Sequence, residues 1–528
     1  MLRRVGEGAP EAFYGVNTWN NVEENLRMKK RIICMALSLA MILALLPPIN
    51  VFGVGDFEII SPSDGFTFNR EKRLTMETNR DLGGEGGSVV DPGGLALPFD
   101  IAHPEEFESG AFEYDPSVLL LKMESEFDGS MTPQLAACGF TTLEEFCAVP
   151  SGTWYRAYLS ENAVITEAVA KARQLDSILV VDYDYLSEES SEGEIEYLDE
   201  AVQDNPRAHE QWYLDSCHIQ EAWAYMAEQG INPGGSSSII VAVIDTGVDY
   251  KHPDLAGSMW VNRSEIPGNG IDDDYNGYVD DIHGVNTIGS RYDHNGDPMD
   301  DHGHGTHVAG IIGATNNDEG IVGIAYNVKI MAIKAGQATG VFNQSDIAEA
   351  IMYAYENGAE VINMSFGSNA CSLAVQEALE VAWTRAVLVA SAGNGIDGVG
   401  MPNEETGELS ALPNYPAAFK FVIGVMSVNR LGMESAFTNW DTNCSNSVEY
   451  EVYAPGEAIL STLPGGQYGY LSGTSMAAPV VSAVAALLRS CYSDRDMYPA
   501  KFIDGQLCAT SEDNAVCYSP KHLPGHNG

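Results

Sequence analysis

Residues 241–249 read Val-Ala-Val-Ile-Asp-Thr-Gly-Val-Asp, a short apolar run that ends in an acid and a glycine. Such a run is typical of a strand buried on both faces of a parallel sheet. Beyond residue 205, similar runs alternate with helical patterns. Strands are predicted over 238–244, 328–334, 360–365, 387–392 and 422–428, and helices over 305–314, 347–357, 373–384 and 475–490. The pattern predicts an α/β domain with a mostly parallel sheet between helices.

Three motifs fall where the carboxyl ends of these strands should gather active groups. Asp245 ends the first strand. A histidine opens the helix in Asp301-His302-Gly303-His304-Gly305-Thr306-His307, and a serine lies in the first helical turn of Ser472-Gly473-Thr474-Ser475-Met476. Each motif alone has an ordinary explanation as a cap, a turn or a metal pair. Together they predict nucleophilic catalysis, because a serine needs an imidazole base and the imidazole needs a carboxylate.

An acyl-transfer site also needs donors for the oxyanion that forms on the attacked carbonyl. The predicted strand 387–392 continues into Gly393-Asn394-Gly395, which presents the amide of Asn394. The backbone N–H of Ser475 at the start of its helix is the second expected donor. His302 and His307 are expected to pack or bond structurally.

With these motifs, the segment from about Gln211 to Arg489 resembles the subtilisin-like serine peptidase family. The resemblance implies a three-layer subtilisin-like fold. It implies the triad Asp245, His304 and Ser475, with Asn394 in the oxyanion hole. It also implies that residues 361–367 include an edge strand that pairs with substrate through Ser365, Phe366 and Gly367, and that Gly393 forms the floor of the primary specificity pocket. Related acid peptidases with a glutamate in the triad lack the His-Gly-Thr-His motif and are excluded.

Two segments predict calcium sites. Residues 272–281 place oxygen ligands at Asp272, Asp274, Asn276 and Asp280, and Gly277 allows the turn between them, although the last glutamate of an EF-hand is missing. The family resemblance implies a second site. Its ligands would be Asp254, Thr315, Asn317, Glu319 and Ile321, with an amino-terminal ligand that could be Asp204, Asn205 or Gln211. A cluster at 293–297 is a weaker candidate.

The amino terminus predicts export. Six of the 27 basic residues lie in the first 31 positions, and a 15-residue apolar run over 32–46 precedes two prolines. Residues 28–53 are therefore predicted to be a signal peptide, which leaves 1–27 as an upstream extension before an alternative start at Met28. We expect a secreted protein that meets the membrane only during export; a membrane anchor is the alternative.

Residues 54–200 are predicted to be a pro-segment. A strand at 117–122, a helix at 163–175 and a strand at 177–183 indicate a small α+β unit over about 114–186. This unit resembles the family's pro-domain, which implies a zymogen whose pro-segment chaperones folding, inhibits the enzyme and is cut off near 187–210. The acidic run 187–200 is predicted to be a solvated linker. Residues 201–490 form the predicted peptidase domain, and 491–528 an irregular, truncated tail without the family's usual final helices.

The charge excludes some partners. The sequence carries 27 Lys and Arg against 75 Asp and Glu, a net charge of −48, which disfavours nucleic acid as a partner. The cysteines contain no closely spaced pair, so zinc is disfavoured, and disulfides and buried thiols both stay open. The sequence therefore predicts a secreted, calcium-stabilised serine endopeptidase acting on polypeptides. The alternative is an inactive peptidase fold that serves as a binding module, but no triad residue is substituted.

Overall fold

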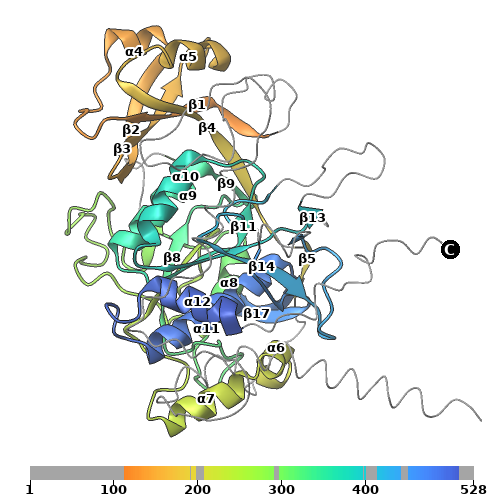
Figure 1. Ribbon diagram of the computed structural model, residues 1–528. Coiled ribbons are helices and arrows are strands. Elements are labelled where there is room, and N and C mark those ends of the chain that lie inside the picture. Colours follow the sequence, from red (N-terminus) through yellow and green to blue (C-terminus); the bar gives the residue numbers. More distant parts are fainter. Residues whose placement is uncertain are drawn as a thin grey trace, which may run out of the picture.

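Figure 1 shows the computed structural model, which describes residues 112–190, 192–197, 207–289, 296–395, 398–399, 413–441 and 450–510. Several predictions fall outside these residues. They concern the upstream extension, the signal peptide, the first part of the pro-segment, the candidate ligands Asp204 and Asn205, and most of the weak cluster at 293–297.

A seven-stranded sheet forms the centre of the peptidase domain. Its order is β16-β14-β12-β10-β6-β8-β7, and every neighbouring pair is parallel. The strands are β6 (Ile240–Asp245), β7 (Gly284–Asn286), β8 (Lys329–Lys334), β10 (Val361–Met364), β12 (Val387–Ser391), β14 (Ile423–Val428) and β16 (Val452–Pro455). The strands predicted from apolar runs are thus confirmed to within a few residues.

Helices cover both faces of this sheet. Successive side chains of a strand point to opposite faces, so Val241 and Val243 pack in one apolar cluster while Ala242 and Ile244 pack in another. The first cluster contains α8 (His304–Gly313) and α11 (Thr474–Cys491), with α7 (Ile219–Glu228); the second contains α9 (Gln344–Glu356) and α10 (Leu373–Ala382). This arrangement confirms the predicted three-layer α/β fold.

Helix α11 is the longest helix of the described residues. By length and composition it could cross a membrane, but 89% of that apolar window is buried inside the protein. This is the pattern of a core helix that packs against the sheet and α8.

The α+β unit lies at the top of Figure 1, against α9 and α10. Its strands are β1 (Tyr114–Met123), β2 (Phe140–Val149), β3 (Gly152–Leu159) and β4 (Ile178–Glu189), paired antiparallel in the order β4-β1-β3-β2. Helices α4 (Pro133–Ala137) and α5 (Ile165–Ala172) cover one face, where Leu119 and Leu121 are buried. Leu120 and Trp154, on the other face, belong to the apolar cluster of α9 and α10.

The acidic run after residue 187 is not the predicted solvated linker. Strand β4 continues to Glu189, and β5 (Glu192–Tyr197) pairs with β18 (Gln467–Ser472), which also pairs with β17 (Ile459–Leu463). Strand pairing is made by backbone groups, so a stretch rich in glutamate can form it wherever a partner edge is free. Composition alone therefore gave the wrong structure here.

The predicted irregular tail also contains regular structure. Helix α12 (Ala500–Thr510) forms there, and Ile503 and Leu507 are buried against the cluster that contains α11. The remaining elements are short: the 3-10 helix η3 (Arg207–His209), α6 (Trp212–Ser216), β9 (Val341–Asn343), β11 (Phe366–Gly367), β13 (Gly398–Val399) and β15 (Trp440–Asp441).

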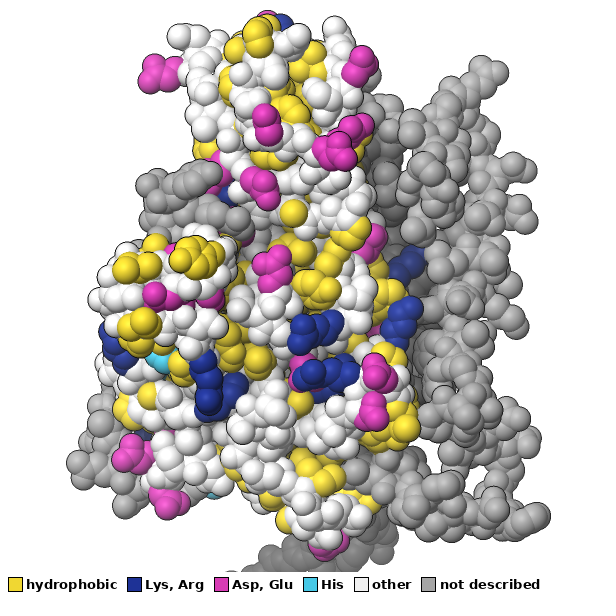
Figure 2. Space-filling view, turned by 90° about the vertical axis from the view of Figure 1, so that its left-hand side faces the viewer, with side chains coloured by type: hydrophobic (Ala, Val, Ile, Leu, Met, Phe, Trp, Pro, Cys, Tyr) yellow, Lys and Arg dark blue, Asp and Glu magenta, His cyan; other side chains and the backbone are white. Residues whose placement is uncertain are grey.

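The surface and the cysteines bear on the remaining predictions. On the face in Figure 2, acidic side chains are scattered from the α+β unit downward, while Lys and Arg side chains gather across the middle. The negative charge therefore does not form one acidic patch on this face.

The cysteines Cys138, Cys371 and Cys491 carry free thiols.

Candidate active site

The three motifs and Asn394 meet at the carboxyl edge of the parallel sheet. Asp245 is the last residue of β6, His304 is the first residue of α8, and Ser475 is in the first turn of α11. Asn394 follows β12. Parallel strands place all their carboxyl ends at one edge, which is why residues up to 230 positions apart in the sequence come together here.

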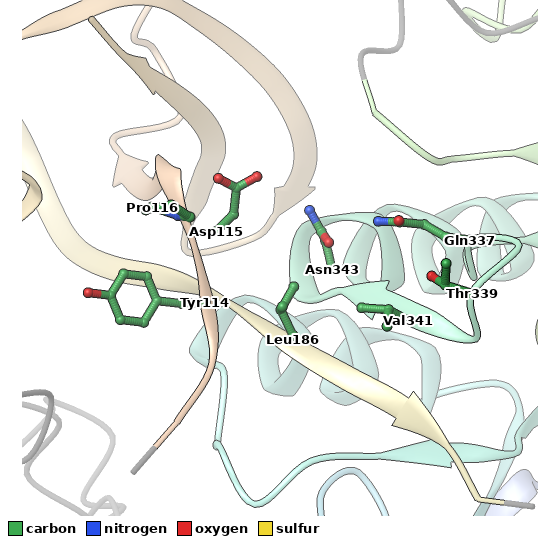
Figure 3. Close-up of a pocket in the computed structure, with 8 residues that line it drawn as sticks. All are labelled: Tyr114, Asp115, Pro116, Leu186, Gln337, Thr339, Val341 and Asn343. Carbon is green, nitrogen blue, oxygen red and sulfur yellow. The ribbon is translucent and has the colours of Figure 1, made fainter. Parts of the chain in front are cut away.

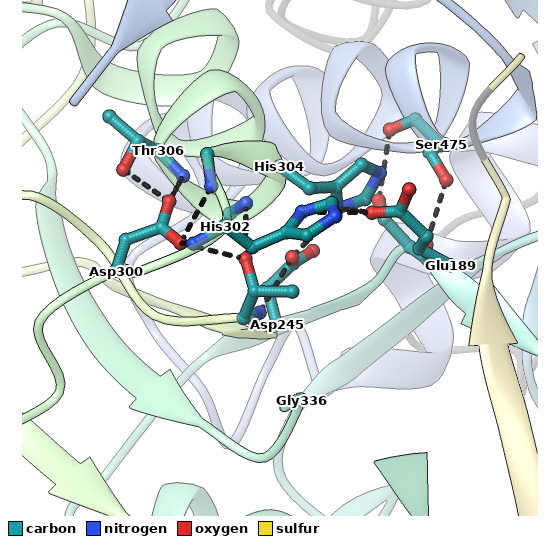
Figure 4. Close-up of polar contacts among 12 residues, drawn as sticks. Glu189, Asp245, Asp300, His302, His304, Thr306, Gly336 and Ser475 are labelled. Atoms are coloured by element: carbon teal, nitrogen blue, oxygen red, sulfur yellow. Dashed lines mark hydrogen bonds and ion pairs between the residues drawn. The ribbon is translucent and has the colours of Figure 1, made fainter. Parts of the chain in front are cut away.

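Asp245 and His304 form a buried pair (Figure 4). The Nδ1 atom of His304 lies 2.7 Å from Oδ1 of Asp245, and both side chains are buried. Oδ1 also accepts the N–H of Thr246 at 2.8 Å. Burial lowers the pKa of His304, but the carboxylates of Asp245 and Glu189 outweigh it and raise this pKa to about 9. The geometry orients the imidazole so that Nε2 is its free end.

Ser475 is turned away from that free end. Its Oγ donates to the backbone carbonyl of Ser365 at 2.7 Å. Nε2 of His304 is buried and makes no hydrogen bond within the described residues. A rotation about the Cα–Cβ bond of Ser475 would be needed to bring its hydroxyl to the imidazole. The structure therefore brings the three candidate triad residues together, with the serine hydroxyl bonded to Ser365 and not to the imidazole.

Two donors lie at the start of α11. The backbone N–H of Ser475 donates to the carbonyl oxygen of Ser190 at 3.1 Å. The Oδ1 atom of Asn394 accepts from the N–H and the hydroxyl of Thr474, at 3.0 and 2.9 Å. This fixes the amide of Asn394, whose buried Nδ2 makes no hydrogen bond in the described part of the chain. Leaving a buried donor without an acceptor is costly in free energy. Nδ2 of Asn394 is therefore placed to donate to an oxyanion that forms beside it.

The carboxyl end of β4 lies beside this site, in the space between β9 and β11 that we call the cleft. It pairs antiparallel with β9 on one side, where Ser187 faces Phe342, and with β11 on the other, where Phe366 faces Glu189 and Gly367 faces Glu188. The N–H of Ser190 donates to the carbonyl of Ser365 at 3.3 Å. The predicted edge residues Ser365, Phe366 and Gly367 thus contact the chain's own segment 188–190. Sequence reasoning missed β9, because three residues carry no periodicity.

Side chains of the cleft also contact this segment. Ser187 is buried, and its Oγ accepts from Nε2 of Gln344 at 2.6 Å. Farther along β4, Leu186 and Asn343 line a pocket shared with the start of β1 (Figure 3). Because β1 forms part of its wall, the α+β unit contributes residues to this pocket.

The predicted pocket floor at Gly393 is crowded. Gly393 has a φ of +95°, and a Cβ there would lie 2.6 Å from Nδ2 of Asn439 and 2.9 Å from Nδ2 of Asn414. Both the backbone conformation and the lack of space require glycine at this position.

The two neighbouring histidines differ. His307 is buried, its Nε2 lies 3.2 Å from the carbonyl of Gly469, and burial lowers its pKa to about 3. This neutral, bonded imidazole is structural, as expected. His302 instead faces Glu189, whose Oε2 lies 3.4 Å from its Nδ1. This contact joins β4 to a loop distant in the sequence, so no local pattern indicated that Glu189 would be the partner of His302.

The candidate calcium site that the family resemblance implies lies around Asp254. Its Oδ2 accepts from the N–H of Ile321 and the hydroxyl of Tyr468, both at 2.9 Å, while Oδ1 is buried without a hydrogen bond in the described residues. The N–H of Thr315 donates to the Asp254 carbonyl at 2.6 Å, and the N–H of Glu319 to Oδ1 of Asn317 at 2.9 Å. The unpaired buried carboxylate oxygen fits a cation.

The amino-terminal ligand predicted for this site has one described candidate. Oε1 of Gln211 accepts the N–H of Val322 at 3.0 Å, so this oxygen already has a donor.

At the candidate calcium site in residues 272–281, the structure brings a further carboxylate to two of the predicted ligands. Carboxylate oxygens of Glu265, Asp272 and Asp274 lie within 4.8 Å of one another. Asp280 instead accepts the N–H groups of residues 268–270, and Nδ2 of Asn276 donates to Asp281. Glu265 lies outside the acidic run, so spacing gave no sign of it.

Comparison with known proteins points to one family. Residues 236–518 match the model of the subtilase family of peptidases. The chain is 41% identical over 258 residues to the thermophilic serine proteinase of Bacillus sp. strain AK1, covering 48% of this chain and 53% of that protein. It is 39% identical over 255 residues to the major intracellular serine protease of Bacillus subtilis strain 168, covering 48% of this chain and 69% of that protein.

A third relative is more distant. The chain is 35% identical over 292 residues to the subtilisin-like protease 1 of Plasmodium falciparum isolate 3D7, covering 54% of this chain and 41% of that protein. The chain spans about half the length of several of these relatives.

Proposed function

Because the chain belongs to the subtilase family of serine peptidases, we propose that it is a serine endopeptidase that cuts its own precursor after Ser190. The observation that carries the proposal is the position of Ser190. Its carbonyl oxygen accepts the N–H of Ser475, and the strand before it is paired on both sides in the cleft. Backbone pairing of an extended segment is how many proteins hold peptides.

In the proposed reaction, Asp245, His304 and Ser475 act as the triad. Oγ of Ser475 turns from the Ser365 carbonyl, passes its proton to Nε2 of His304 and bonds to the carbonyl carbon of Ser190. The N–H of Ser475 and Nδ2 of Asn394 stabilise the oxyanion. Collapse breaks the C–N bond to the next residue, and His304 returns the proton to the leaving amine. Water then releases the acyl group, and polypeptide substrates follow the same course.

The α+β unit and β4 would inhibit the enzyme until they leave. While residues 187–190 fill the cleft, a substrate has no edge strand to pair with. We propose that this unit is the chain's own inhibitor and folding aid, and that the protein is exported through residues 28–53 as a zymogen. Export is tested by finding the protein in the culture medium, with an amino terminus beyond residue 53.

The test of self-cleavage compares the wild-type chain with Ser475→Ala and, as a matched control, with the exposed Ser237→Ala. Wild type and Ser237→Ala should release a fragment that begins at residue 191 and should react with a fluorophosphonate probe. Ser475→Ala should stay intact and unlabelled, with turnover lower by about 10⁶, a magnitude taken from a bacterial subtilisin. An Ser475→Ala chain that cut itself at the wild-type rate would refute the proposal.

We also propose that calcium stabilises the folded protein. Members of this family commonly bind calcium. Here the ligands would come from the Asp254 region, with Thr315, Asn317, Glu319 and Ile321, and from Glu265, Asp272 and Asp274. Calcium that binds only the folded state, at a free concentration of about 100 times its Kd, would raise the free energy of unfolding by about 2.7 kcal/mol. Asp254→Asn and Asp274→Asn should each lose part of the rise in Tm with calcium, whereas the exposed Asp215→Asn should not. A Tm unaffected by chelator would exclude the calcium proposal.

A further inference from the structure

The side chain of Glu189 lies beside the candidate triad (Figure 4), in a space between His302, His304 and Gly340 that we call the recess. Its Oε2 atom is 3.4 Å from Nδ1 of His302 and 3.7 Å from Nδ1 of His304. The Glu189 side chain is 19% exposed and that of His302 is 24% exposed. The two groups are therefore largely shielded from water, and an imidazolium at His302 would pair with this carboxylate.

Gly340 also borders the recess. A Cβ on Gly340 would lie 3.2 and 3.3 Å from Cγ and Cδ of Glu189, and 3.6 Å from Nε2 of His302. Gly340 also has a φ of +79°, which disfavours other residues. The backbone carbonyl of Gly340 accepts the N–H of Glu189 at 3.2 Å. Gly340 therefore leaves room for the side chain of Glu189 and also accepts a hydrogen bond from its backbone.

The acids next to His302 in the sequence have other partners. Oδ1 of Asp301 lies 2.5 Å from Nζ of Lys334. The buried Asp300 accepts the N–H of His302 and further bonds from Gly303 and Thr306, which hold the loop in place. Neither contact uses the imidazole of His302, which leaves the ring facing Glu189.

We propose that His302 determines specificity, so that the enzyme prefers substrates with an acidic side chain on the residue before the one whose carbonyl is attacked. This inference rests on the proposed function, since it assumes that residues 187–190 lie as a substrate does. Without an acid at that position, Nδ1 of His302 would lose the carboxylate oxygen that lies 3.4 Å from it. A lysine would put an ammonium, which only donates hydrogen bonds, where this acceptor now lies, and that is unfavourable. The substrate class is therefore peptides with glutamate or aspartate at that position.

The neighbouring Glu188 supplies an internal control. It is exposed, whereas the side chain of Glu189 is only 19% exposed. Two peptides can therefore be made that are isomers of each other: one with the order Leu-Ser-Gln-Glu-Ser and one with Leu-Ser-Glu-Gln-Ser, each followed by residues 191–194. Their composition and net charge are the same, and only the position of the single carboxylate before the scissile bond differs.

The experiment measures kcat/KM of the matured wild-type enzyme for both isomers. A partly exposed ion pair predicts that the peptide with glutamate next to the final serine is cleaved about fivefold better. In His302→Asn the ratio should fall to about 1, and His302→Glu should prefer a third peptide with lysine at the same position. His209→Gln, whose side chain is 80% exposed, should keep the wild-type ratio.

Each outcome decides the proposal. Equal kcat/KM for the two isomers in wild type would overturn it while leaving the proposed function intact, and this comparison needs no variant. A wild-type ratio that persists in folded His302→Asn would overturn the role of His302. If wild type cleaves neither isomer and reacts with no fluorophosphonate, the proposed function fails and this inference fails with it.

Discussion

The core of the peptidase domain and its contact with the α+β unit bury side chains in different ways. In the core, the central strands bury apolar residues on both faces, as Val243 and Ile244 do on β6. At the contact with α9 and α10, the α+β unit also buries apolar residues, but it adds charged groups from β1, β3 and β4. The core of the peptidase domain buries a few charged groups too, such as the ion pair of Arg489 with Glu360, but its strands meet their covering helices mainly through apolar side chains.

Arg156 on β3 is the centre of the charged contact. Its Nη2 lies 2.9 Å from both Oδ1 of Asp346 and Oε2 of Glu349 on α9, and its Nε donates to Oγ of Ser345 at 3.0 Å. Asp184 on β4 accepts the N–H and hydroxyl of the same serine, at 2.9 and 2.7 Å. Burial raises the pKa of Asp346, although Arg156 opposes this.

This difference suits a contact that must be specific and must later separate. Buried ion pairs add little net free energy over apolar contacts, because both ions lose water, but a missing partner is heavily penalised. Once the bond after Ser190 is cut, the unit can leave and its charges can be hydrated again. We infer that the apolar core holds the enzyme together and the charged contact selects its inhibitor.

The largest expected effect comes from removing the central cation. In the uncut Ser475→Ala chain, Arg156→Met leaves Asp346 and Glu349 buried without it, which should weaken docking by about 3–5 kcal/mol. Hydrogen exchange of the amides of α9 and β3 measures this docking. The matched control is Lys171→Gln, since Lys171 is 52% exposed and pairs only on the surface of α5. Unchanged exchange in Arg156→Met would show that the apolar contacts alone hold the unit.

A smaller effect is expected at Glu377 on α10. Its carboxylate accepts from Nζ of Lys122 at 2.6 Å and from Nε1 of Trp154 at 2.8 Å. Glu377→Gln keeps an acceptor for one donor but removes the charge. Because the side chain is 24% exposed, we expect only about 1 kcal/mol of weaker docking. The same exchange experiment on α10 measures it. A loss as large as that of Arg156→Met would contradict a ranking based on burial.

Local patterns in the sequence predicted the central sheet and its helices. Strands such as β6 and β12 are continuous apolar runs, and α8 and α11 follow helical spacing, so each could be recognised without its neighbours. The three motifs also placed Asp245, His304 and Ser475 at one edge, because parallel strands share that edge. The strands and helices of the central sheet that local patterns predicted are therefore present in the structure.

The features that were missed depend on partners distant in the sequence. Strand β5 consists of residues that a composition argument assigns to solvent, and it forms because β18 offers an edge. Glu265 joins Asp272 and Asp274 from another loop. The contact of Glu189 with His302 joins the α+β unit to the peptidase domain. Helix α12 was missed because the tail was judged by its resemblance to the family and not by its own apolar spacing.

The smallest expected effect concerns the pH dependence of self-cleavage, where the two regions meet at Glu189. His304 must be neutral to accept the proton of Ser475, so the rate should rise with pH through its pKa of about 9. Burial lowers this pKa, and Asp245 and Glu189 raise it. Glu189→Gln removes one of the two carboxylates, so the rise should move to lower pH. Because Glu189 is partly exposed, its removal should change the free energy of protonating His304 by about 1 kcal/mol or less.

The measurement is the rate of fragment release between pH 6 and 10 in wild type, Glu189→Gln and Glu188→Gln. The exposed Glu188 carries the same charge one residue away, so its variant should keep the wild-type profile. If both variants shift the pH profile equally, the overall charge of the segment, and not the contact of Glu189, sets the pKa of His304. If only Glu189→Gln does, the α+β unit sets the ionisation of the imidazole through one side chain, and its departure would leave an enzyme active at lower pH than its precursor.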